Sequence, residues 1–375
     1  MSIPNTFPFQ QRLEKLQAGL IQEKFNNVLI HQNPYIFHFT GWLPPAWMSA
    51  FLLITPKHVV FISPSIPDEA APIWSRTIEY TNFRLDEVVQ SDQEALHALQ
   101  AAIGELGLSG QGVAVALGSF PSTYSLPLSS MVQWSDASAL LHSLTAVKDE
   151  LAIAEIRKRV AMLDRAFETA GRLIRPGLTE LELFSSIYAS LAQSLGSPFT
   201  LDCDLGSGHR TILDEPQPTD KPLQMGETVL IDLFPNLGGY VADITRNFIV
   251  GQPTPGQERQ HSILEEALSN VEKILRPGVT SSEIDRTARR CIDGSEFREF
   301  IYRHHTGHAF GVTTPEPPVI IPADRTVLQA GMVIAVEPGI YHPVNGGMRL
   351  EGNYLITEDG FEALHRFPAQ LTAGG

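Results

Sequence analysis

Five residues of types that bind metal ions lie in apolar or glycine-bounded stretches of the second half of the chain. They are Asp232, Asp243, His308, Glu337 and Glu351. Buried carboxylates are rare unless they are paired or bind a cation. Four carboxylates with one imidazole favour Mn²⁺, Fe²⁺, Co²⁺ or Zn²⁺ over a metal that prefers sulfur. Four negative charges exceed what one divalent ion neutralises, so the set predicts two ions that could share a hydroxide and polarise a carbonyl group.

The two aspartates belong to a predicted β-hairpin over residues 228–247. Two apolar, β-branched runs flank the turn sequence Pro235-Asn236-Leu237-Gly238-Gly239. A turn centred between Leu237 and Gly238 would place Asp232 directly opposite Asp243, with Cβ atoms about 4.5–5.5 Å apart. The alternative is a shifted register in which one aspartate faces solvent.

The other three residues come from later strands. His308 belongs to a histidine cluster, residues 304–311, and glycines lie close to it on both sides. Glu337 ends an apolar strand predicted over 331–337, and Glu351 lies inside a strand predicted over 347–356. A metal site built from these residues therefore needs several strands to converge.

An internal repeat supports two similar halves in this region. Residues 163–183 match residues 264–284, and Arg-Pro-Gly-x-Thr recurs in register. Each copy is expected to be a helix pair followed by strands, with helices over 151–173 and from about 180 to 195 in the first copy. Thr179 and Glu182 fit a capping box at the start of the second helix. The alternative is chance similarity between two amphipathic helices.

The first part of the chain alternates helix and strand patterns and predicts a small α/β domain. Helices are expected over 10–24 and 95–104, and strands over 27–30, 50–54, 58–62 and 113–116. We place the domain boundary between residues 146 and 147, giving domains 1–146 and 147–375. This first domain shows no catalytic cluster, and His31 and His38 are interpreted as structural.

Composition narrows the functional class. The 375 residues carry a formal net charge of −15, which disfavours a nucleic-acid or anionic membrane partner. Cys203 and Cys291 are far apart, so neither a disulfide framework nor a zinc knuckle is predicted. The N-terminus lacks an apolar signal-peptide core, and no apolar run reaches 18 residues. We therefore predict a cytoplasmic protein that does not span a membrane.

The motifs around the five residues resemble those of the pita-bread metallopeptidase family, which includes methionine aminopeptidase, aminopeptidase P and prolidase. The matching segments are residues 239–246, 307–311, 336–339 and 349–351, within a similarity that covers about 150–365. The resemblance implies an α/β N-terminal domain and an α+β pita-bread C-terminal domain with pseudo-twofold halves. The N-terminal domain points to the branch of Xaa-Pro aminopeptidases and prolidases.

The resemblance also implies roles for individual residues. Asp232 would bind one ion, His308 and Glu337 the other, while Asp243 and Glu351 would bridge both. Glu337 would also be the catalytic proton acceptor. His304 would be a catalytic and substrate-side group, and Arg349 would contact the substrate. The expected cofactors are two divalent ions, Mn²⁺ first, with Co²⁺ or Zn²⁺ as alternatives. A homodimer is expected, with the aromatic residues Phe37, Phe39, Trp42 and Trp47 either at an interface or in a domain core.

Two positions depart from the family pattern. Pro315 stands where the family usually has a histidine seven residues after the ligand histidine, and Glu215 stands where another histidine is common. Both histidines would contact the peptide or the tetrahedral intermediate, and the loss of one such donor typically lowers the rate about 10²–10³-fold. We therefore predict slow turnover on ordinary Xaa-Pro peptides.

Three functions fit these features. The first is a dinuclear metallopeptidase that cleaves Xaa-Pro bonds by a metal-bridging hydroxide. The second is a hydrolase of the same fold that acts on a small non-peptide C–N bond. The third is a metal-binding protein with weak or no catalysis. Retention of all five ligand positions favours the first.

Overall fold

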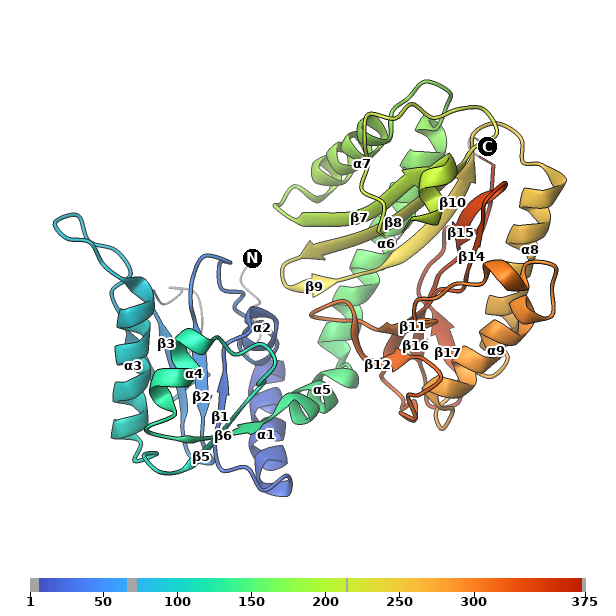
Figure 1. Cartoon of the computed structure of the whole chain (residues 1–375). Coiled ribbons are helices and arrows are strands. Elements are labelled where there is room, and N and C mark those ends of the chain that lie inside the picture. Colours follow the sequence, from blue (N-terminus) through green and yellow to red (C-terminus); the bar gives the residue numbers. More distant parts are fainter. Residues whose placement is uncertain (1–6, 66–72, 214, 373–375) are drawn as a thin grey trace. The chain divides into compact units, whose positions relative to one another are not determined.

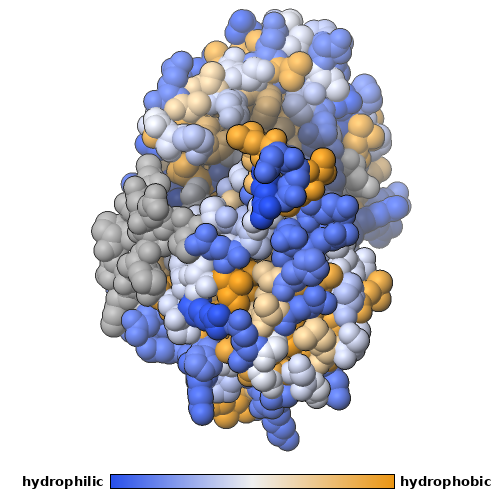
Figure 2. All heavy atoms as spheres, turned by 90° about the vertical axis from the view of Figure 1, so that its left-hand side faces the viewer, coloured by the Kyte–Doolittle hydropathy of each residue, from blue (hydrophilic) through white to orange (hydrophobic). Residues whose placement is uncertain are grey.

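A computed structural model of the chain describes residues 7–65, 73–213 and 215–372 (Figure 1). The contacts divide the chain into two compact units, Met1–Thr145 and Ala146–Gly375. None of the helices in the described residues is long and apolar enough to cross a membrane. On the face drawn in Figure 2, small groups of hydrophobic residues are scattered among hydrophilic ones.

The first unit is a six-stranded mixed sheet with helices on both faces. Its strands lie in the order β4-β3-β2-β1-β5-β6. The helices are α1 (Phe7–Gln22), α2 (Asn33–Thr40), α3 (Ser91–Glu105), α4 (Ser122–Leu128) and α5 (Ser138–Ala146), the last ending one residue into the second unit. The strands are β1 (Val28–Ile30), β2 (Phe51–Ile54), β3 (Val59–Ser63), β4 (Arg76–Glu79), β5 (Gly112–Val115) and β6 (Gln133–Asp136).

Alternation along the central strands sends side chains to two separate hydrophobic cores. Val28 and Ile30 of β1 join one core with α1, α2 and α5, whereas Leu29 joins the other with α3 and α4. Phe37 and Phe39 of α2 are buried, and Phe39 belongs to the first core. These two aromatic residues are therefore part of the domain interior, while Trp47 is 74% exposed.

The second unit begins with the first of two similar halves. A helix pair, α6 (Glu150–Leu173) and α7 (Glu180–Leu195), packs on a sheet with the order β10-β8-β7. The strands are β7 (Thr200–Ser207), β8 (Thr228–Leu237), β9 (Tyr240–Val241), which pairs with β8, and β10 (Ile244–Ile249), with the short helix η1 (Gly208–Ile212) after β7.

The second half repeats this plan. The helices α8 (Pro255–Glu272) and α9 (Ser281–Asp293) are followed by η2 (Arg298–Phe300) and by a sheet with the order β12-β11-β13-β16-β17. Its strands are β11 (Gly307–Ala309), β12 (Glu316–Ile320), β13 (Val333–Val336), β16 (Gly352–Ile356) and β17 (Phe361–Ala363). A separate two-stranded sheet joins β14 (Gly339–His342) to β15 (Gly346–Arg349).

Matching hydrogen bonds confirm the predicted relation between the halves. Gly177 N donates to Leu223 O at 2.9 Å, and Gly278 N donates to Leu328 O at the same distance. Thr179 and Thr280 each begin a helix with a capping box, closed by Glu182 and Glu283. The two similar halves predicted from the repeat are therefore present in the fold.

The same correspondence links two metal-ligand candidates. Leu223 and Leu328 occupy matching positions 105 residues apart, and Gly226 and Gly331 share this offset and a positive φ. Counting 105 residues on from Asp232 reaches Glu337. Each half thus offers one carboxylate at the equivalent place in the sequence, Asp232 within β8 and Glu337 directly after β13.

The predicted hairpin exists, but its register is wrong by two residues. Gly238 and Gly239, with φ of 59° and 89°, form the two-residue turn between Leu237 and Tyr240. Two adjacent positive φ values are typical of a type I′ turn, which glycines adopt without steric cost. Asp232 consequently pairs with Thr245, not with Asp243. A shift of two residues keeps both aspartates on one face, so they are diagonal neighbours.

Candidate metal centre

The five predicted ligand residues come from both halves of the second unit. Asp232 lies in β8, His308 lies in β11, and Asp243 precedes β10. Glu337 directly follows β13. Glu351 lies between β15 and β16, so the prediction that it lies inside one strand over 347–356 was wrong. All five are buried, with at most 6% of any residue exposed. The convergence of strands that the sequence required is therefore observed.

The five side chains form one cluster. Carboxylate oxygens of Asp232, Asp243 and Glu351 lie within 4.8 Å of one another. His308 Nε2 lies 3.4 Å from Asp243 Oδ2 and 3.6 Å from Glu337 Oε1. The His308 imidazole therefore connects the group of Asp232, Asp243 and Glu351 to Glu337.

The raised pKa values of the clustered carboxylates favour the binding of a cation. Burial, with the charge of Glu337, raises the pKa of Asp243 to about 8. Burial, with the charge of Asp243, raises the pKa of Glu351 well above its ordinary value. Among the described residues, Asp232 Oδ1 is buried and has no hydrogen-bond partner. Buried hard oxygen donors that repel one another, one of them without a hydrogen-bond partner, fit divalent cations, so the residues present suit the implied metal ions.

Neighbouring hydrogen bonds hold the candidate ligands in place. Thr245 donates to Glu351 Oε2 through its backbone N at 2.7 Å and its Oγ1 at 3.1 Å. Asn353 Nδ2 donates to the Asp243 backbone oxygen at 2.8 Å. Such partners orient metal ligands before an ion arrives.

A loop from the second half reaches Asp243 as well. Thr314 Oγ1 donates to Asp243 Oδ2 at 2.7 Å. The loop is fixed by Glu316, whose Oε1 accepts from the backbone N of Val312 and Thr313, both at 2.9 Å. Glu316 Oε2 is 2.8 Å from Lys148 Nζ in a buried ion pair. Sequence reasoning missed Lys148 and Glu316 because they lie 168 positions apart.

Arg349 lies among the carboxylates. Its Nη2 contacts Asp232 and lies 3.0 Å from Asp204 Oδ2, and its Nε donates to Thr245 Oγ1 at 3.0 Å. The guanidinium therefore compensates two carboxylates and orients Asp232. Direct substrate contact by Arg349 remains a prediction.

His304 has a defined tautomer in this arrangement. Its Nδ1 lies 2.7 Å from the His305 carbonyl oxygen, which can only accept, so Nδ1 carries the proton. Its Nε2, 2.8 Å from the Tyr341 hydroxyl, must then accept. Burial lowers the pKa of His304 to about 4. The ring is thus neutral near pH 7 and is held by Tyr341.

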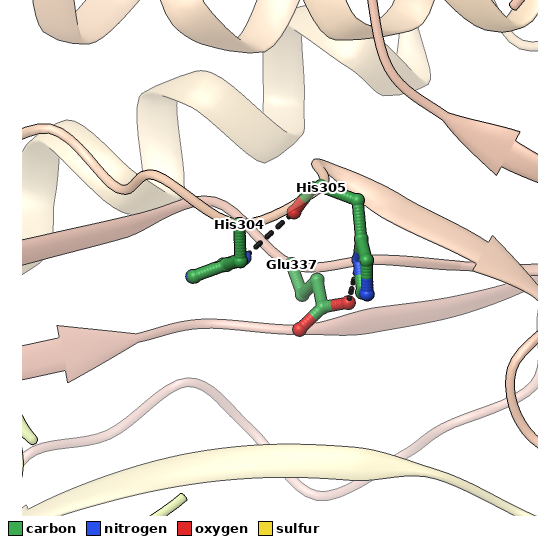
Figure 3. A group of neighbouring side chains, drawn as sticks. All are labelled: His304, His305 and Glu337. Carbon is green, nitrogen blue, oxygen red and sulfur yellow. Dashed lines mark hydrogen bonds and ion pairs between the residues drawn. The ribbon is translucent and has the colours of Figure 1, made fainter. Parts of the chain in front are cut away.

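His305 is a site residue that sequence reasoning did not single out. Its Nδ1 lies 3.0 Å from Glu337 Oε1 (Figure 3). Its ring centroid lies 5.9 Å from that of His304 and 5.1 Å from that of His308. Burial opposes ionisation of Glu337, but His305, His308 and Arg349 together lower its pKa to about 2. The adjacent pair of histidines was a visible signal that this segment faces the site with two rings.

A cavity of about 590 Å³ opens beside the cluster. Four of the five ligand candidates line it, together with His304, His305, Tyr341 and Arg349. Pro315 and Glu215, the two departures from the family pattern, also line it. Asp202 and Glu215 lie close enough to Asp204 that their charges help burial to raise its pKa, against the effect of Arg349.

Comparison with known proteins shows which protein family the chain is similar to. Residues 154–358 match the family model described as metallopeptidase family M24. The chain is 28% identical to a Xaa-Pro dipeptidase from Pyrococcus horikoshii over 364 residues, covering 96% of this chain and 98% of the relative. It is 31% identical to the probable dipeptidase PepE of Mycobacterium tuberculosis over 268 residues, covering 70% and 71%.

A solved structure agrees with the sequence relatives. The prolidase from Pyrococcus horikoshii OT3 superposes with a TM-score of 0.82 at 26% identity, covering 96% of this chain and 99% of that chain. The family model alone spans more than half of the 375 residues. The two similar halves, the converging carboxylates and these matches together establish that the chain belongs to metallopeptidase family M24 and has its pita-bread fold.

Proposed function

We propose that this protein is a dinuclear metallopeptidase that hydrolyses peptide bonds preceding proline. The observation that carries the proposal is the assembly of Asp232, Asp243, His308, Glu337 and Glu351 beside one cavity. The relatives named Xaa-Pro dipeptidase support the bond type. Mn²⁺ is the favoured metal, with Co²⁺ or Zn²⁺ as alternatives. A homodimer in the cytoplasm remains part of the proposal, and light scattering would test its mass against the 41.3 kDa chain.

The proposed ligand division follows the family pattern. Asp232 would hold one ion, His308 and Glu337 the other, and Asp243 and Glu351 would be shared. When bound, the ions would supply Lewis acidity that polarises a carbonyl group and lowers the pKa of water.

The chain's own residues would position the substrate and move the proton. Glu337, kept ionised by its neighbours, would accept a proton at a carboxylate oxygen and return it to the leaving nitrogen. His304 would act beside the substrate through Tyr341, whose hydroxyl it holds at 2.8 Å. Burial of the cluster excludes water and strengthens each of these interactions.

The test combines metal analysis with an activity assay. Chelator-treated protein reloaded with Mn²⁺ or Co²⁺ should bind about two ions and cleave Xaa-Pro peptides. Asp243→Ala should bind fewer ions and lose more than about 100-fold in kcat, because even partners outside the ligand shell commonly contribute 10–100-fold. Glu358→Ala, at an exposed carboxylate, is the control. Metal content near zero in wild type and variant alike would contradict the proposal.

A further inference from the structure

The charge of the cavity has a consequence for which substrates can enter. Six carboxylate residues line it, namely Asp202, Asp204, Glu215, Asp232, Asp243 and Glu337. Arg349 is the one lysine or arginine among the described residues of its lining. Three histidines, His304, His305 and His308, also line it.

Arg349 is not free to receive a second anion. Its Nη2 already contacts Asp232 and Asp204, and its Nε and Nη1 donate to Thr245 and Tyr341. Its guanidinium side chain is only 11% exposed. A carboxylate from a substrate would have to displace Asp204 or Asp232 to gain this charge.

Two of the acidic residues, Asp202 and Glu215, have no positively charged partner among the described residues. Asp202 and Asp204 alternate along β7, so both side chains are on one face, and Asp204 pairs with Asp232 in the next strand. Asp202 and Glu215 are exposed, and neither forms an ion pair within the described part of the chain. Two divalent ions would offset the deeper carboxylates and leave this outer wall negative.

A dipeptide would bring its own negative charge to this wall. The carboxylate of an Xaa-Pro dipeptide is attached to the proline ring, a few bonds from the scissile nitrogen. When the scissile carbonyl lies at the metal ligands, that carboxylate must enter the same cavity. A desolvated carboxylate without a cationic partner is strongly disfavoured, and nearby like charges add repulsion.

We infer that this cavity selects Xaa-Pro substrates whose proline carboxyl is not free, namely amides and longer peptides, over Xaa-Pro dipeptides. The inference rests on the proposed function and refines its substrate class. It separates this chain from the relatives whose names describe dipeptidases. Like charges about 7 Å apart near a protein surface change binding by about tenfold or more for each acidic group.

The test compares Ala-Pro with Ala-Pro amide on the Mn²⁺-loaded full chain at pH 7.5. The pair differs at the carboxyl terminus by one charge. We expect kcat/KM for the amide to exceed that for the dipeptide by about tenfold or more. The ratio should fall as salt rises from about 0.05 to 0.5 M, because salt screens charges in solvent-accessible sites.

Charge reversal at the wall supplies the second measurement. Glu215→Lys should lower the amide-to-dipeptide ratio about tenfold or more, chiefly by lowering KM for the dipeptide. Glu358→Lys makes the same charge change at an exposed site outside the cavity and should leave the ratio unchanged.

The outcomes distinguish a failure of the inference from a failure of the proposed function. Equal or faster hydrolysis of the dipeptide by wild type would overturn the inference and leave the proposed function standing. A ratio that Glu215→Lys does not move would also overturn it. Cleavage of neither compound would overturn the proposed function and the inference together.

Discussion

His305 brings an imidazole to the carboxylate that is proposed to move the proton. Its Nδ1 lies 3.0 Å from Glu337 Oε1, and its side chain is about one-third exposed to the cavity. Such a contact can orient Glu337 without binding an ion. A residue that positions a ligand in this way typically contributes about 10–100-fold to activity.

His305→Ala should therefore lower kcat by about 10–100-fold while the protein still binds two ions. His305→Asn, which keeps a hydrogen-bond donor, should recover part of the loss. His209→Ala is a matched control, since His209 is exposed and absent from the cavity lining. A fall in metal content with His305→Ala would instead make His305 a ligand, and an unchanged kcat would remove it from the mechanism.

At the scale of elements, Glu180 fixes the segment that carries Glu215. This fully buried carboxylate lies in the first turn of α7. Its Oε1 accepts from Ser207 N and Oγ, both at 2.8 Å, and its Oε2 accepts from Thr219 N at 3.1 Å and Oγ1 at 2.8 Å. Arg210 completes the group with Nε 3.1 Å from Oε2. Glu180 therefore joins α7 to both ends of residues 207–219.

Glu180→Ala should lower the free energy of unfolding by about 3–5 kcal/mol, because it leaves buried donors and a partly buried arginine without their partner. Glu182→Ala, which removes only the capping-box carboxylate of the same helix, should cost about 1 kcal/mol. Urea unfolding of both variants gives the comparison. Equal losses would show that the buried network adds nothing beyond the helix cap.

The elements differ in how far the sequence could predict them. The helices α6 and α7 carry long apolar periodicities and a capping box, so their extents were close to those predicted. The edge strands β4 and β6 of the first sheet are half-exposed and polar, so no hydrophobic pattern in the sequence predicted them. The prediction of the hairpin register was wrong because the register depends on which two residues form the turn, and the hydrophobic pattern does not determine those residues.

In the candidate site too, some features could be predicted from the sequence and others could not. Residue types and motifs picked out the five residues that the structure brings together as candidate ligands, since each lies in a distinctive local sequence. The contacts of His305, Asp204 and Tyr341 could not be predicted, because they depend on how separate strands cross in space. Arg349 was identified, yet its pairing with Asp232 and Asp204 emerged only from the fold.

At the scale of the whole molecule, a buried histidine makes stability depend on pH. Burial, with the charge of Arg246, lowers the pKa of His261 in α8 to about 4, against an ordinary value of 6.5. Glu265 lies 3.5 Å away but is about half exposed, so it does not offset this effect. The unfolded chain therefore binds a proton at pH values where the folded chain does not, and stability falls as pH drops from 6.5 toward 4.

Acidification from pH 7 to pH 5 should remove about 2 kcal/mol of stability through this residue. His261→Leu should lose correspondingly less over the same interval, measured by urea unfolding at both pH values. His97→Leu, at an exposed histidine of α3, should behave like wild type. Identical pH dependence in wild type and His261→Leu would show that His261 does not contribute.

The ion pair between Lys148 and Glu316 determines where the chain can be cut. Val147 bridges to Met332 and Lys148 N donates to Gly331 O at 2.9 Å, so these residues are built into the second unit before α6 begins. A shortened protein starting at residue 154, where the family model begins, would lack Lys148 and leave the buried Glu316 carboxylate without its cationic partner. Loss of one partner of a buried ion pair typically lowers the free energy of unfolding by about 3–5 kcal/mol. Glu316 holds the loop whose Thr314 reaches Asp243. An excised second unit must therefore start no later than Val147 if the loop that reaches Asp243 is to keep its position.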